Sequence, residues 1–378
     1  MTSPVAASAK VEDMVKRAIR EALEKRKIAG VAPVGEEVPD MEEELKTPPK
    51  EYERLAECVL GDDQVKFSTL LNLKTLTAGN DFAVTIYKTE LWDESIRGFI
   101  PNIDPDYLIP VETASSILLA WELDEKVLCY GPTGAGKSTL VEQLCALTKR
   151  PFIRINCTGD MDSSMIFGQL TAKDGSTVWV DGPVTEAVRH GAVFAWDEWD
   201  VTPPEIAMGL QWLLEDNGKL FLKEMPGTSQ DKLVIPHKHF KLVAIGNTQG
   251  QGDDTGAHAG TNVQNSATLD RFGTAIYVDY LSHDAEENIL KKKFSENPTV
   301  TEYIQPLVKV ANLVRSAYRA GQLSLTMSPR TLISVCRKVA VGRSLQEALA
   351  NVYLNKLSGV QAKVAKELVV KIMGSKFK

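Results

Sequence analysis

The sequence Gly131-Pro-Thr-Gly-Ala-Gly-Lys-Ser138 is the most informative stretch of this chain. It matches the spacing G-x-x-x-x-G-K-[ST], in which glycines let backbone N–H groups turn inward around phosphate oxygens. An apolar run, Val127-Leu-Cys-Tyr130, precedes it, and an amphipathic stretch follows it. This context predicts a strand, a phosphate-binding loop and a helix whose N-terminal dipole favours anions. Residues 131–138 are called the phosphate loop below.

The phosphate loop predicts bound ATP and Mg²⁺. We expect the ammonium group of Lys137 to reach the β- and γ-phosphates and the hydroxyl of Ser138 to ligate the metal ion. The residues expected to contact the nucleotide are Gly131, Pro132, Thr133, Gly134, Ala135, Gly136, Lys137, Ser138 and Thr139.

Two carboxylates end a second apolar run, Ala192-Val-Phe-Ala-Trp-Asp-Glu198. A buried strand here would place Asp197 at the carboxyl edge of a sheet, where open α/β sheets bind ligands. We expect Asp197 to hold Mg²⁺, mostly through water. Glu198 is expected to polarise the water that attacks the γ-phosphate, which favours hydrolysis over transfer to a small acceptor.

Three further polar residues follow the phosphate loop and the two carboxylates along the chain. Their order is a more specific signal of a nucleotide site than any one of the residues. Asn247 ends the apolar run of residues 240–246 and could hold the attacking water or the γ-phosphate by a hydrogen bond. Arg271 precedes the next predicted strand, and Arg330 starts a predicted helix. A lone arginine is by default a surface charge. Arg271 and Arg330 are therefore candidate site residues only because they follow the carboxylates in this order.

The chain alternates between β-rich runs and helical segments from residue 111 onward. Predicted strands at 126–130, 152–156, 192–196, 240–246 and 274–278 indicate a parallel sheet covered by helices. Only helical signals follow residue 283. We therefore expect four regions: an N-terminal helix with an acidic, Pro-rich linker at 1–50, a small region at 51–110, the α/β nucleotide-binding domain at 111–282, and an all-helical lid at 283–378.

Composition narrows the functional class. The 378 residues carry a net charge of −7, which gives no overall basic footprint for nucleic acid. No apolar run is long enough to cross a membrane, and the N-terminus has no apolar signal core. The five cysteines form no C-x-x-C pair, so we expect buried free thiols in a cytoplasmic protein. His237 and His239 lack the further ligands that a zinc site needs.

The ordered motifs resemble those of AAA+ ATPases, in the helix-2-insert branch that contains MoxR-like ATPases, magnesium chelatase and the cobaltochelatase CobS subunits. A long stretch between the second and third predicted sheet strands, 159–191, resembles the branch's β-hairpin insert, and a second hairpin is expected at 219–236. The resemblance to CobS is strongest and covers roughly residues 100–375. It is carried by Asn102-Ile-Asp-Pro-Asp-Tyr-Leu108, Trp196-Asp-Glu-Trp-Asp200, Ala244-Ile-Gly-Asn-Thr248, Gly250-Gln-Gly-Asp-Asp-Thr-Gly256, Gly260-Thr-Asn262, Leu269-Asp-Arg-Phe272, Tyr280-Leu-Ser-His-Asp284 and Met327-Ser-Pro-Arg-Thr331.

The resemblance implies a P-loop AAA+ core with a central five-stranded parallel sheet, β-hairpin inserts and a helical lid. It also implies a homo-oligomeric ring, usually hexameric, with nucleotide between neighbouring subunits. Arg271 matches the arginine finger that acts on the next subunit's nucleotide. Arg330 matches the lid's sensor-2 arginine, which acts on its own or on a neighbour's nucleotide.

The expected function is Mg²⁺-dependent ATP hydrolysis that drives conformational change in a partner protein. A chelatase motor subunit, working with a partner that carries a von Willebrand A domain, is one specific form. Two alternatives stay open. One is a motor stimulated by nucleic acid, against which the mixed charges of the hairpins argue. The other is a nucleotide-gated scaffold without significant hydrolysis, which Lys137, Asp197 and Glu198 disfavour.

Overall fold

The computed structural model describes residues 64–73, 81–252 and 260–374. The predicted N-terminal helix and acidic linker, Cys58 and residues 253–256 of the glycine-rich motif lie outside the described residues. The four other cysteines are buried free thiols, as expected. No helix among the described residues is both long and apolar enough to cross a membrane.

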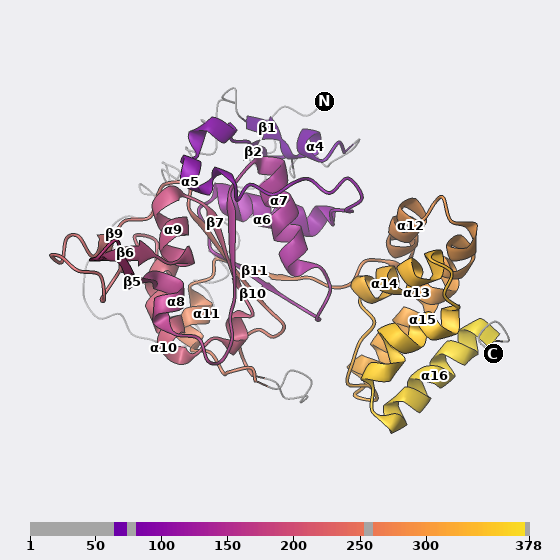
Figure 1. Ribbon diagram of the computed structural model, residues 1–378. Coiled ribbons are helices and arrows are strands. Elements are labelled where there is room, and N and C mark those ends of the chain that lie inside the picture. The colour runs from indigo at the N-terminus through magenta and orange to yellow at the C-terminus, as the bar shows by residue number, and fades with distance from the viewer. Residues whose placement is uncertain (1–63, 74–80, 253–259, 375–378) are drawn as a thin grey trace, which may run out of the picture. The chain divides into compact units, whose positions relative to one another are not determined.

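A five-stranded parallel sheet forms the centre of the nucleotide-binding region (Figure 1). Its strand order is β11-β3-β10-β7-β4, so the phosphate-loop strand β3 lies between β11 and β10. The predicted parallel sheet is therefore confirmed. Its strands are β3 (Val127–Tyr130), β4 (Phe152–Asn156), β7 (Val193–Asp197), β10 (Lys241–Gly246) and β11 (Thr274–Tyr277).

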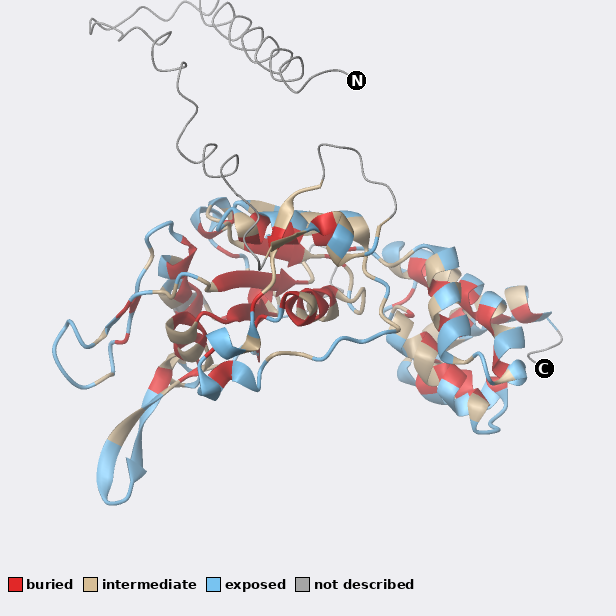
Figure 2. Ribbon diagram, turned by 90° about the horizontal axis from the view of Figure 1, so that it is seen from above, coloured by how far each residue is buried: buried red, intermediate tan, exposed pale blue. Residues whose placement is uncertain are grey.

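Alternate residues of the inner strands bury opposite faces of this sheet, as the two-residue period of a strand requires. Val193 and Ala195 of β7 pack in the cluster formed with α6 (Val111–Glu122) and α7 (Lys137–Thr148). Phe194 and Trp196 pack on the other side, with α9 (Pro183–His190) and α10 (Pro204–Gln211). Both faces are thus covered at the inner strands β3, β7 and β10, whose residues are almost all buried and drawn in red in Figure 2. This explains why these strands read as continuous apolar runs.

Two β-hairpins interrupt the α/β alternation where the resemblance places them. The first pairs β5 (Gly168–Lys173) with β6 (Ser176–Asp181), between α8 (Ser163–Phe167) and α9. Most of its side chains are exposed. The second hairpin is short and pairs β8 (Leu220–Phe221) with β9 (Leu233–Val234).

The region before the sheet is small. β1 (Gln64–Lys66) pairs antiparallel with β2 (Ala83–Thr85). The short helices are α4 (Phe67–Leu70), η1 (Thr89–Leu91) and α5 (Glu94–Arg97). Residues 101–110 contain no helix, as their three prolines predict.

Helices alone follow the sheet, from His283 to Met373. Ser282, Asn297, Ser328 and Ser344 each cap a helix N-terminus with a side-chain hydrogen bond, and a proline follows two of these caps. The helices bury one shared apolar cluster of their own. They are α12 (His283–Lys293), α13 (Pro298–Arg319), α14 (Pro329–Ala340), α15 (Leu345–Val352), η4 (Leu354–Lys356) and α16 (Gly359–Met373).

A buried ion pair crosses this helical cluster. Both guanidinium nitrogens Nη1 and Nη2 of Arg315 donate to the carboxylate of Glu286 at 2.7 Å, and Nε donates to the carbonyl of Met327 at 2.8 Å. Arg315 is 3% exposed and Glu286 2%. Every charged atom of the pair is therefore satisfied inside the protein, which joins α12 to α13.

We expect Glu286→Ala to lower the free energy of unfolding by about 3–5 kcal/mol, because it leaves a buried guanidinium without its counter-charge. Urea denaturation followed by circular dichroism measures the change. The control is Glu347→Ala, which removes the partner of the exposed pair with Arg343 and should cost at most about 1 kcal/mol. Equal losses in the two variants would contradict the expected difference.

Candidate nucleotide-binding site

The phosphate loop has the backbone geometry that its glycines predict. Gly134 and Gly136 have φ angles of 77° and 93°, in the left-handed region that glycine adopts without strain. A Cβ at Gly131 would lie 2.2 Å from the carbonyl oxygen of Val278, so that position admits no side chain. The loop runs directly into α7, whose first residue is Lys137. Its N-terminal amides are thereby available to an anion.

Lys137 is a buried cation held at the base of the loop. Its Nζ donates to the carbonyls of Gly131 at 2.7 Å and Pro132 at 3.1 Å, and to Oδ1 of Asn247 at 3.1 Å. Burial lowers the pKa of Lys137, whereas the negative charges of Glu198, Asp197 and Asp200 oppose that shift. These three acceptors hold the ammonium group next to the inside of the loop.

Asp197 is the last residue of β7 and is 4% exposed. Its Oδ2 accepts a hydrogen bond from the Ser138 hydroxyl at 2.8 Å and lies 2.5 Å from Nη2 of Arg154. Its Oδ1 accepts from the backbone N–H of Glu198 at 3.0 Å. Ser138 and Asp197, the two residues expected to hold the metal, are therefore within hydrogen-bond distance of each other. Each carries a side-chain oxygen that can ligate a metal ion.

Glu198 leaves the strand in a left-handed conformation, with a φ of 55° that is uncommon outside glycine. Its Oε2 accepts a hydrogen bond from Nδ2 of Asn247 at 2.9 Å. Burial raises the pKa of Glu198, and the charges of Asp200 and Asp197 add to the effect. A carboxylate with a raised pKa is a stronger base once it is ionised.

Asn247 connects the acidic and basic sides of this arrangement. Its Nδ2 donates to Glu198, while its Oδ1 accepts from Lys137 and from the Thr133 hydroxyl, the latter at 3.3 Å. The two ends of one amide therefore contact both the phosphate loop and the end of β7. The term polar cluster is used below for Lys137, Ser138, Asp197, Glu198 and Asn247.

Asp200 is a functional residue that sequence reasoning missed as an individual. Its Oδ2 accepts hydrogen bonds from the backbone N–H groups of Asn247 and Thr248 at 3.0 and 2.8 Å, and from the Thr248 hydroxyl at 2.9 Å. Its side chain is fully buried, and its Oδ1 has no hydrogen-bond partner. Asp200 thus fixes the backbone that carries Asn247. The sequence offered only the repeated acidic pattern of Trp196–Asp200 as a signal.

Arg154 was also missed, because nothing in its local sequence distinguishes it from an exposed strand residue. It lies on β4, and only the pairing of β4 with β7 brings it to Asp197.

The two predicted arginines are not part of the polar cluster. Arg271 follows α11 (Ser266–Asp270) and donates to the carbonyl of Ala267 at 2.6 Å and to Oε1 of Glu215 at 3.2 Å. Glu215 follows η3 (Trp212–Leu214). Arg330 is exposed in the first turn of α14 and makes no hydrogen bond or ion pair to the described residues of the polar cluster.

The donor set of the polar cluster fits a magnesium nucleotide. Ser138 and Asp197 offer hard oxygen ligands, which suit Mg²⁺, and the loop amides and Lys137 suit phosphate. Among the described residues, no group of three or more His, Cys, Asp or Glu side chains could enclose a metal by itself.

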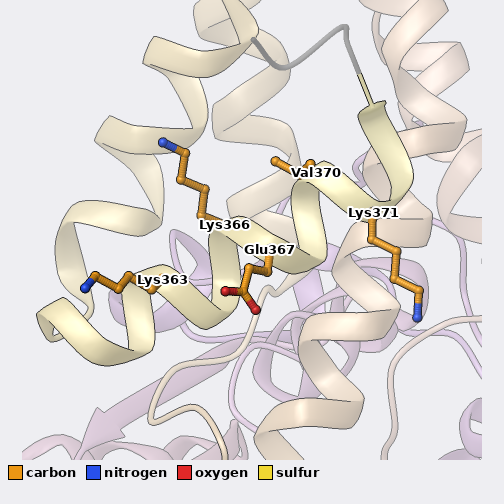
Figure 3. A pocket seen from close by; sticks show the side chains of 5 residues that line it. All are labelled: Lys363, Lys366, Glu367, Val370 and Lys371. Carbon is orange, nitrogen blue, oxygen red and sulfur yellow. The ribbon is translucent and has the colours of Figure 1, made fainter.

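A shallow hollow on α16 is not a comparable site. Its lining residues are Lys363, Lys366, Glu367, Val370 and Lys371, and Figure 3 shows the three lysine side chains pointing in different directions. No polar groups converge on a common point there, whereas they do at the end of β7.

The chain is similar to several known proteins. A model of the AAA domain (dynein-related subfamily) matches residues 126–272. The aerobic cobaltochelatase subunit CobS of a Sinorhizobium species is 32% identical over 286 residues, which is 74% of this chain and 85% of that protein. Midasin of Dictyostelium discoideum is 34% identical over 190 residues, which is 50% of this chain but 3% of midasin. The solved RuvB Holliday junction branch migration motor of Thermotoga maritima is 15% identical, with 74% of this chain and 75% of that chain covered and a TM-score of 0.39.

The sheet order, the phosphate loop and the polar cluster define a P-loop ATPase of the AAA+ class. Within that class, the chain belongs to the family of the cobaltochelatase subunit CobS, as the identity and coverage of that match show. The resemblance inferred from the motifs is thereby confirmed.

Removing the support under Asn247 should weaken the whole site. We expect Asp200→Ala to lower the free energy of unfolding by about 2–5 kcal/mol, since it leaves two backbone N–H groups without an acceptor. Urea denaturation measures this loss. The matched control is Asp231→Ala, because Asp231 accepts from the N–H and hydroxyl of Thr228 in an exposed turn where water can replace it. A loss no larger than the control's would contradict the role given to Asp200.

Proposed function

We propose that this protein hydrolyses ATP with Mg²⁺ at the polar cluster. The observation that carries the proposal is the meeting of a phosphate-loop lysine, a Ser–Asp oxygen pair and a Glu–Asn pair at the carboxyl ends of β3, β7 and β10. Oxygens, amides and one ammonium group therefore surround a single position. Phosphoryl transfer depends mainly on such positioning and charge stabilisation.

Each residue of the polar cluster has a proposed role. Lys137 and the loop amides bind the phosphates, and Ser138 and Asp197 hold Mg²⁺, which when bound neutralises phosphate charge. Glu198 accepts a proton from the attacking water, and its raised pKa suits that task. Asn247 orients the Glu198 carboxylate and is placed to sense the γ-phosphate through its contact with Lys137.

We propose further that the protein works as a homo-oligomeric, hexameric ring in which Arg271 acts on the neighbour's nucleotide. Arg271 is partly exposed and makes no contact with the polar cluster of its own chain, which supports an action in trans. The ion pair with Glu215 holds the guanidinium until a neighbour's phosphates compete for it. Arg330 is proposed as the lid arginine that contacts nucleotide during the cycle.

The proposed outcome of hydrolysis is conformational remodelling of a partner protein. The relative named as an aerobic cobaltochelatase subunit supports a chelatase motor as one form. The proposal of a partner that carries a von Willebrand A domain rests on the motif resemblance alone. The short hairpin does not favour nucleic acid, because Lys219, Lys223 and Lys232 lie among Glu224 and Asp231.

Two substitutions should separate binding from hydrolysis. Lys137→Ala should abolish tight ATP binding, since it removes the main positive charge that faces the phosphates. Glu198→Gln should keep binding and lower turnover by roughly 10²–10⁴-fold, because an amide cannot accept the proton of water. Equilibrium binding of a fluorescent ATP analogue and phosphate release measure the two effects. Equal losses of affinity in both variants would argue against these separate roles.

Mixing two inactive variants tests the action of Arg271 in trans. An Arg271→Ala chain keeps a complete polar cluster, and a Glu198→Gln chain keeps its arginine. Their mixture should recover part of the ATPase activity, because some interfaces then pair an intact arginine with an intact site. An arginine finger is worth roughly 10³–10⁵ in rate, so a minority of such interfaces stands above background.

The mixing experiment needs proof of subunit exchange, which labelled chains provide. Arg343→Ala is the control, because it removes an exposed arginine that pairs with Glu347 in its own helical region and should leave activity unchanged. If exchange occurs and activity stays at the level of the separate variants, Arg271 does not act in trans.

A further inference from the structure

Arg154 brings a second positive charge to the carboxylate proposed to hold the metal. It lies on β4 beside β7, in register with Ala195, two residues before the pair Asn156 and Asp197. Its Nη2 lies 2.5 Å from Oδ2 of Asp197, the same oxygen that accepts from Ser138 at 2.8 Å. Arg154 therefore contacts the oxygen that faces the other proposed metal ligand.

The contact has a clear electrostatic cause. The side chain of Asp197 is 6% exposed, and a buried carboxylate without a counter-charge is strongly destabilising. Lys137, the other nearby cation, donates its hydrogen bonds to carbonyls and to Asn247 rather than to Asp197. A guanidinium cannot lose its proton in a protein, so Arg154 is a permanent counter-charge.

The same contact conflicts with metal binding. Mg²⁺ requires near-ideal octahedral geometry and a free lone pair on each oxygen ligand. Two donors already share Oδ2, and a guanidinium at hydrogen-bond distance repels a dication that approaches the same oxygen. The side chain of Arg154 is 41% exposed, whereas that of Asp197 is not, so the arginine is the partner that can move.

We propose that Arg154 is a displaceable counter-cation of the metal site: it neutralises Asp197 in the absence of metal and must leave Oδ2 before Mg²⁺, or a water molecule that Mg²⁺ holds, takes its place there. Arg154 consequently sets how much Mg²⁺ the protein needs. This inference rests on the proposed function, because it assumes that Asp197 serves the metal.

The experiment measures the Mg²⁺ requirement of nucleotide binding rather than activity. Binding of a fluorescent ATP analogue is titrated with Mg²⁺, starting from EDTA, in the full-length wild type and in Arg154→Gln. We expect the Mg²⁺ midpoint of the variant to fall by roughly threefold to tenfold, since the competing cation is gone. We also expect nucleotide-free Arg154→Gln to melt at a lower temperature than the wild type in EDTA and to be stabilised more by added Mg²⁺.

The matched control is Arg189→Gln. Arg189 forms a similar half-exposed pair with a shielded carboxylate, with 2.7 Å between its Nε and Oδ2 of Asp181, but that pair joins α9 to β6 outside the polar cluster. Its loss should lower the melting temperature and leave the Mg²⁺ midpoint unchanged. Arg154→Lys keeps a positive charge without the planar fork; we expect a smaller shift of the midpoint in the same direction, which also serves if Arg154→Gln fails to fold.

The outcomes separate this inference from the function on which it rests. A wild type whose nucleotide binding depends on Mg²⁺, with an unchanged or raised midpoint in both Arg154 variants, would overturn the counter-cation role alone. A wild type that binds nucleotide equally well in EDTA and in Mg²⁺ would overturn the proposed metal site and the inference together. A lowered midpoint in the Arg154 variants, absent from Arg189→Gln, supports the proposal.

Discussion

The parallel pairing of β10 with both β3 and β7 is the constraint on which the rest of the structure depends. Because all three strands run the same way, their carboxyl ends reach one edge of the sheet. That edge receives the phosphate loop after β3, Asp197 and Glu198 at the end of β7, and Asn247 after β10. Residues separated by more than a hundred positions thereby come within hydrogen-bond distance.

Local sequence signals explain how much of the sheet and of the polar cluster could be predicted from the sequence. The inner strands β7 and β10 are buried on both faces, so each is a largely apolar run, and Asp197 and Asn247 stand where these two runs end. The phosphate loop is likewise a local pattern of glycines. Arg154 and Asp200 carry no such signal, because their partners come from a neighbouring strand and from the residues after β10. Their roles follow only from the strand order.

Arg271 and Arg330 show a different limit of prediction from the sequence. Arg271 and Arg330 were assigned by resemblance and by their order in the chain, and within this chain they contact none of the polar cluster. A residue whose partner belongs to another subunit leaves no intrachain distance that identifies it. One chain does show the contact of Arg271 with Glu215, which a neighbour's phosphates must outweigh under the proposed action in trans. Assembly and nucleotide binding would then be coupled through one carboxylate.

The charged side chains around the end of β7 indicate why the nucleotide should bind together with a metal ion. Three carboxylates, Asp197, Glu198 and Asp200, face two cations, Lys137 and Arg154, so the site carries a negative formal charge. A nucleotide brings further negative charge, and its approach is favourable only if more positive charge comes with it. Mg²⁺ supplies that charge, and on the proposal above it displaces Arg154 from Oδ2 of Asp197. Metal-free nucleotide would leave Arg154 on Asp197 and the phosphates facing two more carboxylates, so the arrangement discriminates in favour of the magnesium complex.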